Sequence, residues 1–205
     1  MQAQLARGGG VAASTRDRLL DVASTIVTTD GWSHVTMGRV AALVGVSRQT
    51  VYNELGTKDG LAEALVARET DRFLELVGEQ LLAHGADMVA GITAAVRVAL
   101  EHGADNQLIA AVVGAGHGRD DGLLPLLTTR PEPVLARAVW TLTAFGDANW
   151  AHLGLPATEL HQLLDAVVRL TLSHLVQPQW PPEQVAELIG RLAAGACRAA
   201  HQPLT

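Results

Sequence analysis

Residues 36–58 read TMGRVAALVGVSRQTVYNELGTK and form the most informative stretch of this 205-residue chain. Thr36 is a good N-cap for a short helix over 37–44, and Gly45 favours a sharp turn directly after it. Ser47 then caps a second helix, which we expect to run to about residue 55. Two short helices joined by a glycine-containing turn are typical of a helix-turn-helix motif.

The two helices of this motif each have an apolar and a polar face. Ala41 is small enough to let the helices cross closely, and four valines are predicted to fill the seam between them: Val40, Val44, Val46 and Val51. Polar side chains remain for the exposed side of the second helix: Arg48, Gln49, Thr50 and Asn53. Such side chains contact base edges and phosphates of DNA. A helical hairpin that serves only the core is the alternative, and it leaves this polar cluster unexplained.

A longer pattern around the motif resembles the TetR family of bacterial regulators. The match covers roughly residues 14–72 and consists of Gly31-Trp32-x-x-Val35-Thr36, then Val40-Ala41-x-x-Val44-Gly45-Val46-Ser47-x-x-Thr50-Val51-Tyr52, then Gly56-Thr57-Lys58-Asp59-x-Leu61. The resemblance is specific because many spaced positions agree. It implies an all-α protein with an N-terminal three-helix helix-turn-helix DNA-binding domain and a larger C-terminal helical domain for ligand binding and dimerisation.

The resemblance also implies roles for individual residues of the DNA-binding surface. Phosphate contacts are expected from Thr36, Tyr52 and Lys58. Base contacts are expected from Arg48, Gln49, Thr50 and Asn53, and Ser47 is expected to cap the helix that reads the bases. Two positions depart from the family pattern, because Glu54 stands where tyrosine or histidine is common and Leu55 where an aromatic residue is usual. Glu54 would repel phosphate unless it accepts a hydrogen bond from cytosine N4, so the departures concern base reading and not the fold.

Helical periodicity and capping residues predict the remaining elements. A first helix is expected from Ser14 or Thr15 to Gly31, and a fourth from residue 57 or 58 toward His84. Further helices are expected to be opened by Asp87, by Asp105 (ending near 113), by Pro131 and Pro133 (to about Leu153), by Pro156 and Thr158 (ending before Pro178), and by Pro181 and Pro182 (to about Ala200), with a glycine-rich loop at 114–122 and a helical turn at 123–127. The expected divisions are a flexible arm (1–13), the DNA-binding domain (14–60) and the ligand-binding and dimerisation domain (61–205).

The last two helices are the expected dimer contact. By resemblance they pair with their twofold mates in a four-helix bundle, which places them at about 158–176 and 182–200. The small residues of the final helix (Gly190, Ala193, Ala194, Gly195 and Ala196) permit close approach of a partner helix. The predicted interface consists of Leu163, Val167, Leu170, His174, Leu188, Leu192 and Gly195. An intrachain core is the alternative for the same residues.

A small-molecule pocket is expected between the helices of the larger domain. The predicted lining is Met88, Ile92, Val96, Trp140, Phe145, Asn149 and Trp150, which is mostly apolar with few polar groups. Plain core is the alternative for these residues. The lack of clustered charge favours an apolar ligand, such as a fatty acyl or similar hydrocarbon chain.

The charge of the chain is unevenly distributed. Its net charge is −6, yet residues 1–58 hold six basic and four acidic residues. A positive head on an acidic body is expected where only the head meets a polyanion such as DNA.

Several function classes lack support in the sequence. The longest apolar runs are too short to cross a membrane, the start lacks an apolar signal core, and Cys197 is the single cysteine of the sequence, which excludes an internal disulfide. No catalytic triad, metal-ligand spacing or cofactor fingerprint appears, so we expect no enzyme, no cofactor and no metal. The prediction is a cytoplasmic, homodimeric repressor that a small apolar molecule releases from a palindromic double-stranded operator. The alternatives are an activator of the same family, a helical adaptor or a small all-α enzyme.

Overall fold

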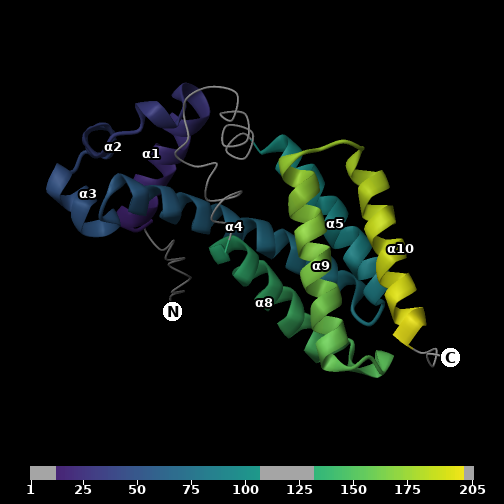
Figure 1. Ribbon diagram of the computed structural model, residues 1–205. Coiled ribbons are helices and arrows are strands. Elements are labelled where there is room, and N and C mark those ends of the chain that lie inside the picture. Colours follow the sequence, from purple (N-terminus) through teal and green to yellow (C-terminus); the bar gives the residue numbers. More distant parts are fainter. Residues whose placement is uncertain (1–12, 107–131, 201–205) are drawn as a thin grey trace, which may run out of the picture.

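The computed structural model describes residues 13–106 and 132–200, and within them it contains helices and no strand (Figure 1). The elements are α1 (Thr15–Asp30), η1 (Trp32–His34), α2 (Met37–Val44), α3 (Arg48–Leu55), α4 (Lys58–His84), α5 (Met88–Asp105), α8 (Glu132–Asn149), η3 (Ala151–Leu153), α9 (Ala157–Val176) and α10 (Pro182–Ala200). The predicted all-α class is therefore confirmed. Residues 1–12 of the expected arm (1–13), and the elements expected between 107 and 131, lie outside the described residues.

Polar caps begin the helices where the sequence predicts them. The side chains of Ser14, Thr36, Ser47, Thr57 and Asp87 each accept a hydrogen bond from a backbone amide in the first turn of the following helix. Such bonds satisfy amide groups that have no partner within the helix. Gly45 ends α2 with φ 78° and ψ 34°, a left-handed conformation that glycine adopts without steric cost. Caps and glycine together produce the predicted turn between α2 and α3.

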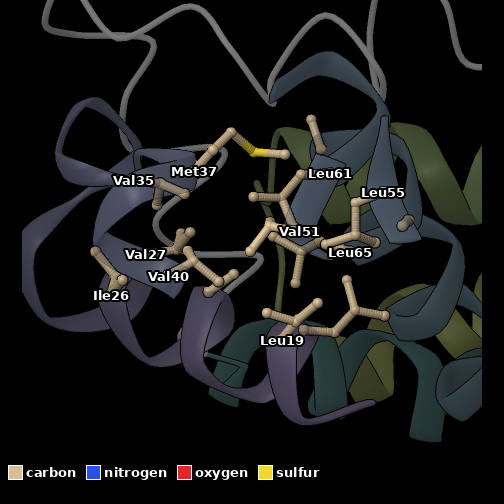
Figure 2. Packing of buried hydrophobic residues seen from close by; sticks show 14 of the residues in the cluster. Leu19, Ile26, Val27, Val35, Met37, Val40, Val51, Leu55, Leu61 and Leu65 are labelled. Carbon is tan, nitrogen blue, oxygen red and sulfur yellow. The ribbon is translucent and has the colours of Figure 1, made fainter. Parts of the chain in front are cut away.

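The first three helices and the start of α4 share one apolar core, which we call the head core. Its residues lie between Leu19 and Leu65, and Val40, Val51 and Leu61 point toward one another at its centre (Figure 2). Val40, Val51 and Leu61 are fully buried, and Val46 packs at the edge of the cluster. The predicted valine seam is thus confirmed, and burial of these side chains holds α3 across α2.

Helix α4 continues from the head core into the larger helical body. The expected domain boundary after residue 60 falls inside this 27-residue helix, and Leu65 still belongs to the head core. A second cluster begins at Val77 and includes residues of α5, α8, α9 and α10. One continuous helix therefore contributes side chains to both cores, and no proline interrupts it.

The body has α5 at its centre, packed against α4 and α10 (Figure 1). Trp150 is buried and its Nε1 donates to the carbonyl oxygen of Gly85 at 2.9 Å, which ties the end of α8 to the turn between α4 and α5. The helix expected from Pro131 to Leu153 is shorter than predicted, since α8 stops at Asn149 and η3 follows. The prediction that Asp105 opens a helix is also wrong, because Asp105 is the last residue of α5.

Two of the five small residues of α10, Gly190 and Ala193, have a different role from the one expected. Gly190 lies so close to Thr93 of α5 that a Cβ on Gly190 would overlap the hydroxyl oxygen of Thr93. Ala193 is completely buried. These two residues allow close packing of α10 on α5 within one chain, not on a partner chain. Sequence alone left both possibilities open because a small residue permits close approach on any side.

None of the helices in residues 13–106 and 132–200 is both long and apolar enough to cross a bilayer.

Candidate functional site

Helix α3 presents a polar face at the end of the molecule remote from α9 and α10 (Figure 1). Arg48, Gln49 and Asn53 are exposed, and Tyr52 is 48% exposed. The Gln49 Nε2 donates to Asn53 Oδ1 at 2.9 Å, so the two amides are held side by side one helical turn apart. Paired amides in this orientation offer both donors and acceptors, as base edges require.

The opposite face of α3 explains one departure from the family pattern. Leu55 is buried in the head core together with Val51. Its side chain stabilises the motif from inside and does not reach the polar face. Glu54 is exposed, and its backbone oxygen accepts a hydrogen bond from Arg16 of α1.

Several basic residues of the head bind within the chain. Arg18 Nη2 donates to the carbonyl oxygen of Val44 at 2.9 Å, and Arg16 donates to that of Glu54. These carbonyls lie at the C-terminal ends of α2 and α3, where a cation is favourable to the helix dipole. Arg39 pairs with Asp30, and the salt bridge lowers the pKa of the Asp30 carboxyl. Three of the arginines that make the head positive therefore bind groups within the head and hold its helices together.

Lys58, predicted to contact phosphate, already has two partners in the head. Its Nζ donates to the carbonyl oxygen of Trp32 at 3.2 Å and lies 4.8 Å from the centroid of the Trp32 ring. Thr36 and Ser47 also have partners, because as helix caps their side-chain oxygens accept hydrogen bonds from the backbone amides of Arg39 and Thr50, respectively. These intrachain contacts fix the positions of the three side chains, so a phosphate would meet groups that are already oriented.

Gly38 is a residue of this surface that sequence reasoning missed. A Cβ at Gly38 would lie 2.6 Å from Nε of Arg48, so the absence of a side chain makes room for the guanidinium across the start of α2. No local signal reveals this, because the contact joins two helices.

A second feature is an elongated cavity of about 130 Å³ between α4, α5, α8 and α9. Its wall is almost entirely apolar, and polar side chains come only from Glu69, Thr70 and Thr171 among the described residues. The lining on α4 extends from Leu65 to Leu81, which corresponds to about 24 Å of helix at 1.5 Å per residue. The shape and the apolar wall suit a narrow apolar molecule.

The predicted pocket residues separate into two groups. Ile92 and Val96 line this cavity, whereas Met88, Phe145, Asn149 and Trp150 lie outside its wall. Trp140 is 70% exposed on α8 and also lies outside. Sequence reasoning did not separate these five from the lining residues, because helical spacing does not show which apolar stripe faces a void.

The residues predicted for dimerisation also differ in their surroundings. Leu170 and Leu192 are exposed on α9 and α10, and His174 lies 5.7 Å from the exposed Trp180 between ring centroids. Leu163, Leu188 and Gly195 are half-buried. Val167 is a correction: it is 4% exposed and lines the cavity, so its side chain faces inward within its own chain.

Metal ligands do not gather in this fold as far as residues 13–106 and 132–200 show, since no group of three or more His, Cys, Asp or Glu is placed to share an ion.

Two domain families match the chain. The model described as bacterial regulatory proteins, tetR family, matches residues 19–65. The model described as bacterial Tetracyclin repressor, C-terminal domain, matches residues 87–195, which is more than half of the chain. Together they cover the head and the body that contains the cavity.

Individual relatives show the same likeness. The HTH-type transcriptional regulator AlkX of Mycobacterium tuberculosis (strain ATCC 25618 / H37Rv) is 31% identical over 177 residues, which covers 86% of this chain and 82% of that protein. The TetR family repressor AlkX from Dietzia sp. strain DQ12-45-1b, implicated in biodegradation of n-alkanes, is 25% identical with a TM-score of 0.73 and covers 92% of this chain and 98% of its own. The R. erythropolis repressor QsdR, 15% identical with a TM-score of 0.60 over 87% of this chain and 94% of its own, shares the fold.

Proposed function

This chain belongs to the TetR family of bacterial regulatory proteins, which are DNA-binding transcriptional regulators, and we propose that it is a repressor released from a palindromic operator by a small apolar molecule. The observation that carries the proposal is the polar face of α3, which the buried seam beneath it holds outward. We infer that it acts as a homodimer in the cytoplasm, where its operator lies.

DNA reading is assigned to the exposed face of α3. Arg48, Gln49, Thr50 and Asn53 are proposed to contact bases, and Thr36, Tyr52 and Lys58 to contact phosphates, while Ser47 caps the reading helix. A dimer would place two α3 helices in successive major grooves, roughly 34–36 Å apart. The exposed Leu170, Leu192 and Trp180 support an interface built from α9 and α10.

The effector is assigned to the apolar cavity and is proposed to have a hydrocarbon body. Support comes from the wall chemistry and from likeness to AlkX, the Dietzia repressor implicated in biodegradation of n-alkanes. The cavity is close in size to engineered apolar cavities of roughly 150 Å³ that accept benzene. A longer chain would therefore have to push the surrounding helices apart.

Helix α4 connects such expansion to DNA. Leu65 belongs to the head core and also lines the cavity. Arg68, on the next turn, donates to Asp21 Oδ1 of α1 at 2.7 Å and so joins α4 to the head a second time. A ligand that displaces α4 would carry the head with it and change the spacing of the two reading helices.

The first test is selection of bound sites from a random DNA pool with purified full-length protein. Tyr52→Phe is expected to weaken binding roughly two- to tenfold on every selected sequence, because one phosphate hydrogen bond is lost. Gln49→Ala is expected to change which bases are preferred. Gln184→Ala, exposed at the start of α10, is the control and should change neither.

Salt dependence separates a DNA-binding protein from an adaptor. Log affinity should fall with log salt at about 0.9 per phosphate neutralised. Absence of any saturable DNA binding would contradict the proposal. Binding only in the presence of an effector would instead indicate a co-repressor or activator mode.

A further inference from the structure

The three polar residues that border the cavity, Glu69, Thr70 and Thr171, share one property, which is that their side-chain oxygens can accept hydrogen bonds. Thr70 Oγ1 donates its hydrogen to the carbonyl oxygen of Val66 at 2.8 Å, and Thr171 Oγ1 donates to that of Val167 at 2.8 Å. Both hydroxyl hydrogens are thus held by the residue one turn earlier in the same helix. The remaining lone pairs of these hydroxyls can only accept.

Glu69 supplies the third polar group and is an acceptor as well. Its side chain is 15% exposed, and its Oε1 accepts a hydrogen bond from Asn106 Nδ2 and lies 3.5 Å from His102 Nε2. Its Oε2 lies 3.9 Å from Arg72 Nη1, too far for a hydrogen bond. The carboxylate is therefore half-buried, has basic or polar neighbours on one side, and keeps lone pairs that these neighbours do not fill.

We propose that the cavity selects a hydrocarbon that carries one hydrogen-bond donor, namely a primary alcohol, and that Glu69 and Thr70 determine this specificity. The inference rests on the proposed function, since it names the head group of the effector assigned to the same cavity. The hydrocarbon chain lies along the apolar wall of α4, and the hydroxyl donates to Glu69 or Thr70 near the head core.

Other head groups fit this wall less well. A carboxylate would face the Glu69 carboxylate with no side-chain donor among the described lining residues, and like charges repel where water is scarce. An alkane leaves the three acceptors without a donor from the ligand. An alkylammonium would add a cation beside Arg72 and His102, which already face Glu69.

The test compares decanol, decane and decanoate on the purified full-length protein by isothermal titration. Decanol is expected to bind roughly two- to tenfold more tightly than decane, which is the contribution of one net hydrogen bond. Decanoate is expected to bind more weakly than decanol by at least roughly tenfold.

Two variants locate the selecting group. Glu69→Gln replaces a pure acceptor by an amide that also donates, so the preference for decanol over decanoate should fall roughly tenfold. Thr70→Val keeps the shape but removes an acceptor, and should weaken decanol binding without affecting decane. Glu79→Gln is the matched control on the exposed side of α4 and should leave all three affinities unchanged.

The outcomes distinguish this inference from the proposed function. Equal or tighter binding of decanoate or decane, or an unchanged preference in Glu69→Gln, overturns the alcohol specificity and leaves an apolar effector in place. Failure of all three ligands to bind overturns both the alcohol specificity and the hydrocarbon effector, whereas operator binding is judged by the DNA selection. Tightest binding of decanol, lost selectively in the Glu69 and Thr70 variants, supports both.

Discussion

Ser14 and Asp17 bind each other reciprocally at the start of α1. The Ser14 hydroxyl donates to Asp17 Oδ2 at 2.6 Å, its amide donates to the same oxygen at 3.2 Å, and its Oγ accepts the Asp17 amide at 3.0 Å. The hydrogen bonds from the Ser14 side chain and backbone lower the pKa of Asp17 below its ordinary value. The two residues thus form a capping box in which aspartate replaces the usual glutamate.

Acid should remove the stabilisation from this capping box. Because folding lowers the pKa of Asp17, its contribution is complete above the unfolded pKa and disappears as pH falls through the folded pKa. Asp17→Asn should therefore be less stable than the wild type at neutral pH, and the difference should shrink in acid. Urea unfolding midpoints over a pH series measure this. Ser14→Ala should show the same trend, and a difference independent of pH would contradict the explanation.

At the scale of elements, helix packing depends on where glycine is required. Gly190 of α10 meets Thr93 of α5, whose hydroxyl already donates to the carbonyl oxygen of Val89 at 2.7 Å. Gly78 of α4 has open space in the direction of a Cβ. The two glycines look alike in sequence because both lie inside long helices.

Substitution by alanine should separate the two sites. Gly190→Ala is expected to destabilise the protein by roughly 1–3 kcal/mol, because Thr93 must rotate and lose its hydrogen bond or the helices must move apart. Gly78→Ala should instead stabilise it by up to about 1 kcal/mol, through helix propensity alone. Denaturant unfolding gives both free energies. Equal effects at the two positions would show that α10 does not pack closely on α5.

At the scale of the whole molecule, the proposed DNA-reading face lies at one end and the proposed dimer face at the other. Leu192 is 51% exposed on α10, on the outer side of the body formed by α9 and α10. Leu82 is more exposed still, at 71%, but belongs to α4, which is not one of the two helices of the proposed interface. Exposure alone therefore does not identify the interface.

Charge substitutions should distinguish these two faces. Leu192→Asp is expected to give a folded monomer, because two aspartates would face each other across the twofold interface, and affinity for a palindrome should fall to that for a half-site. Leu82→Asp is the control and should remain dimeric. Sedimentation velocity and operator titration measure the two effects. A dimeric Leu192→Asp protein would place the interface elsewhere.

Much of the DNA-binding head could be predicted from local sequence. The caps at Ser14, Thr36 and Ser47, the turn at Gly45 and the valine seam depend on residues within a few positions of one another. Such signals act over one or two helical turns, so a linear reading recovers the bounds of α1 to α4 and the outward residues of α3.

The positions of the cavity and of the outward helix faces required the tertiary structure. Val167 and Leu170 are both apolar residues of α9, yet one lines the cavity and the other is exposed. Trp140 was expected inside and lies outside, while Glu69 and Thr171 were not expected and lie in the wall. Local periodicity shows that a helix has an apolar stripe, but the neighbours that the stripe meets come from distant parts of the chain. Only their packing determines which side chains become core, cavity wall or free surface.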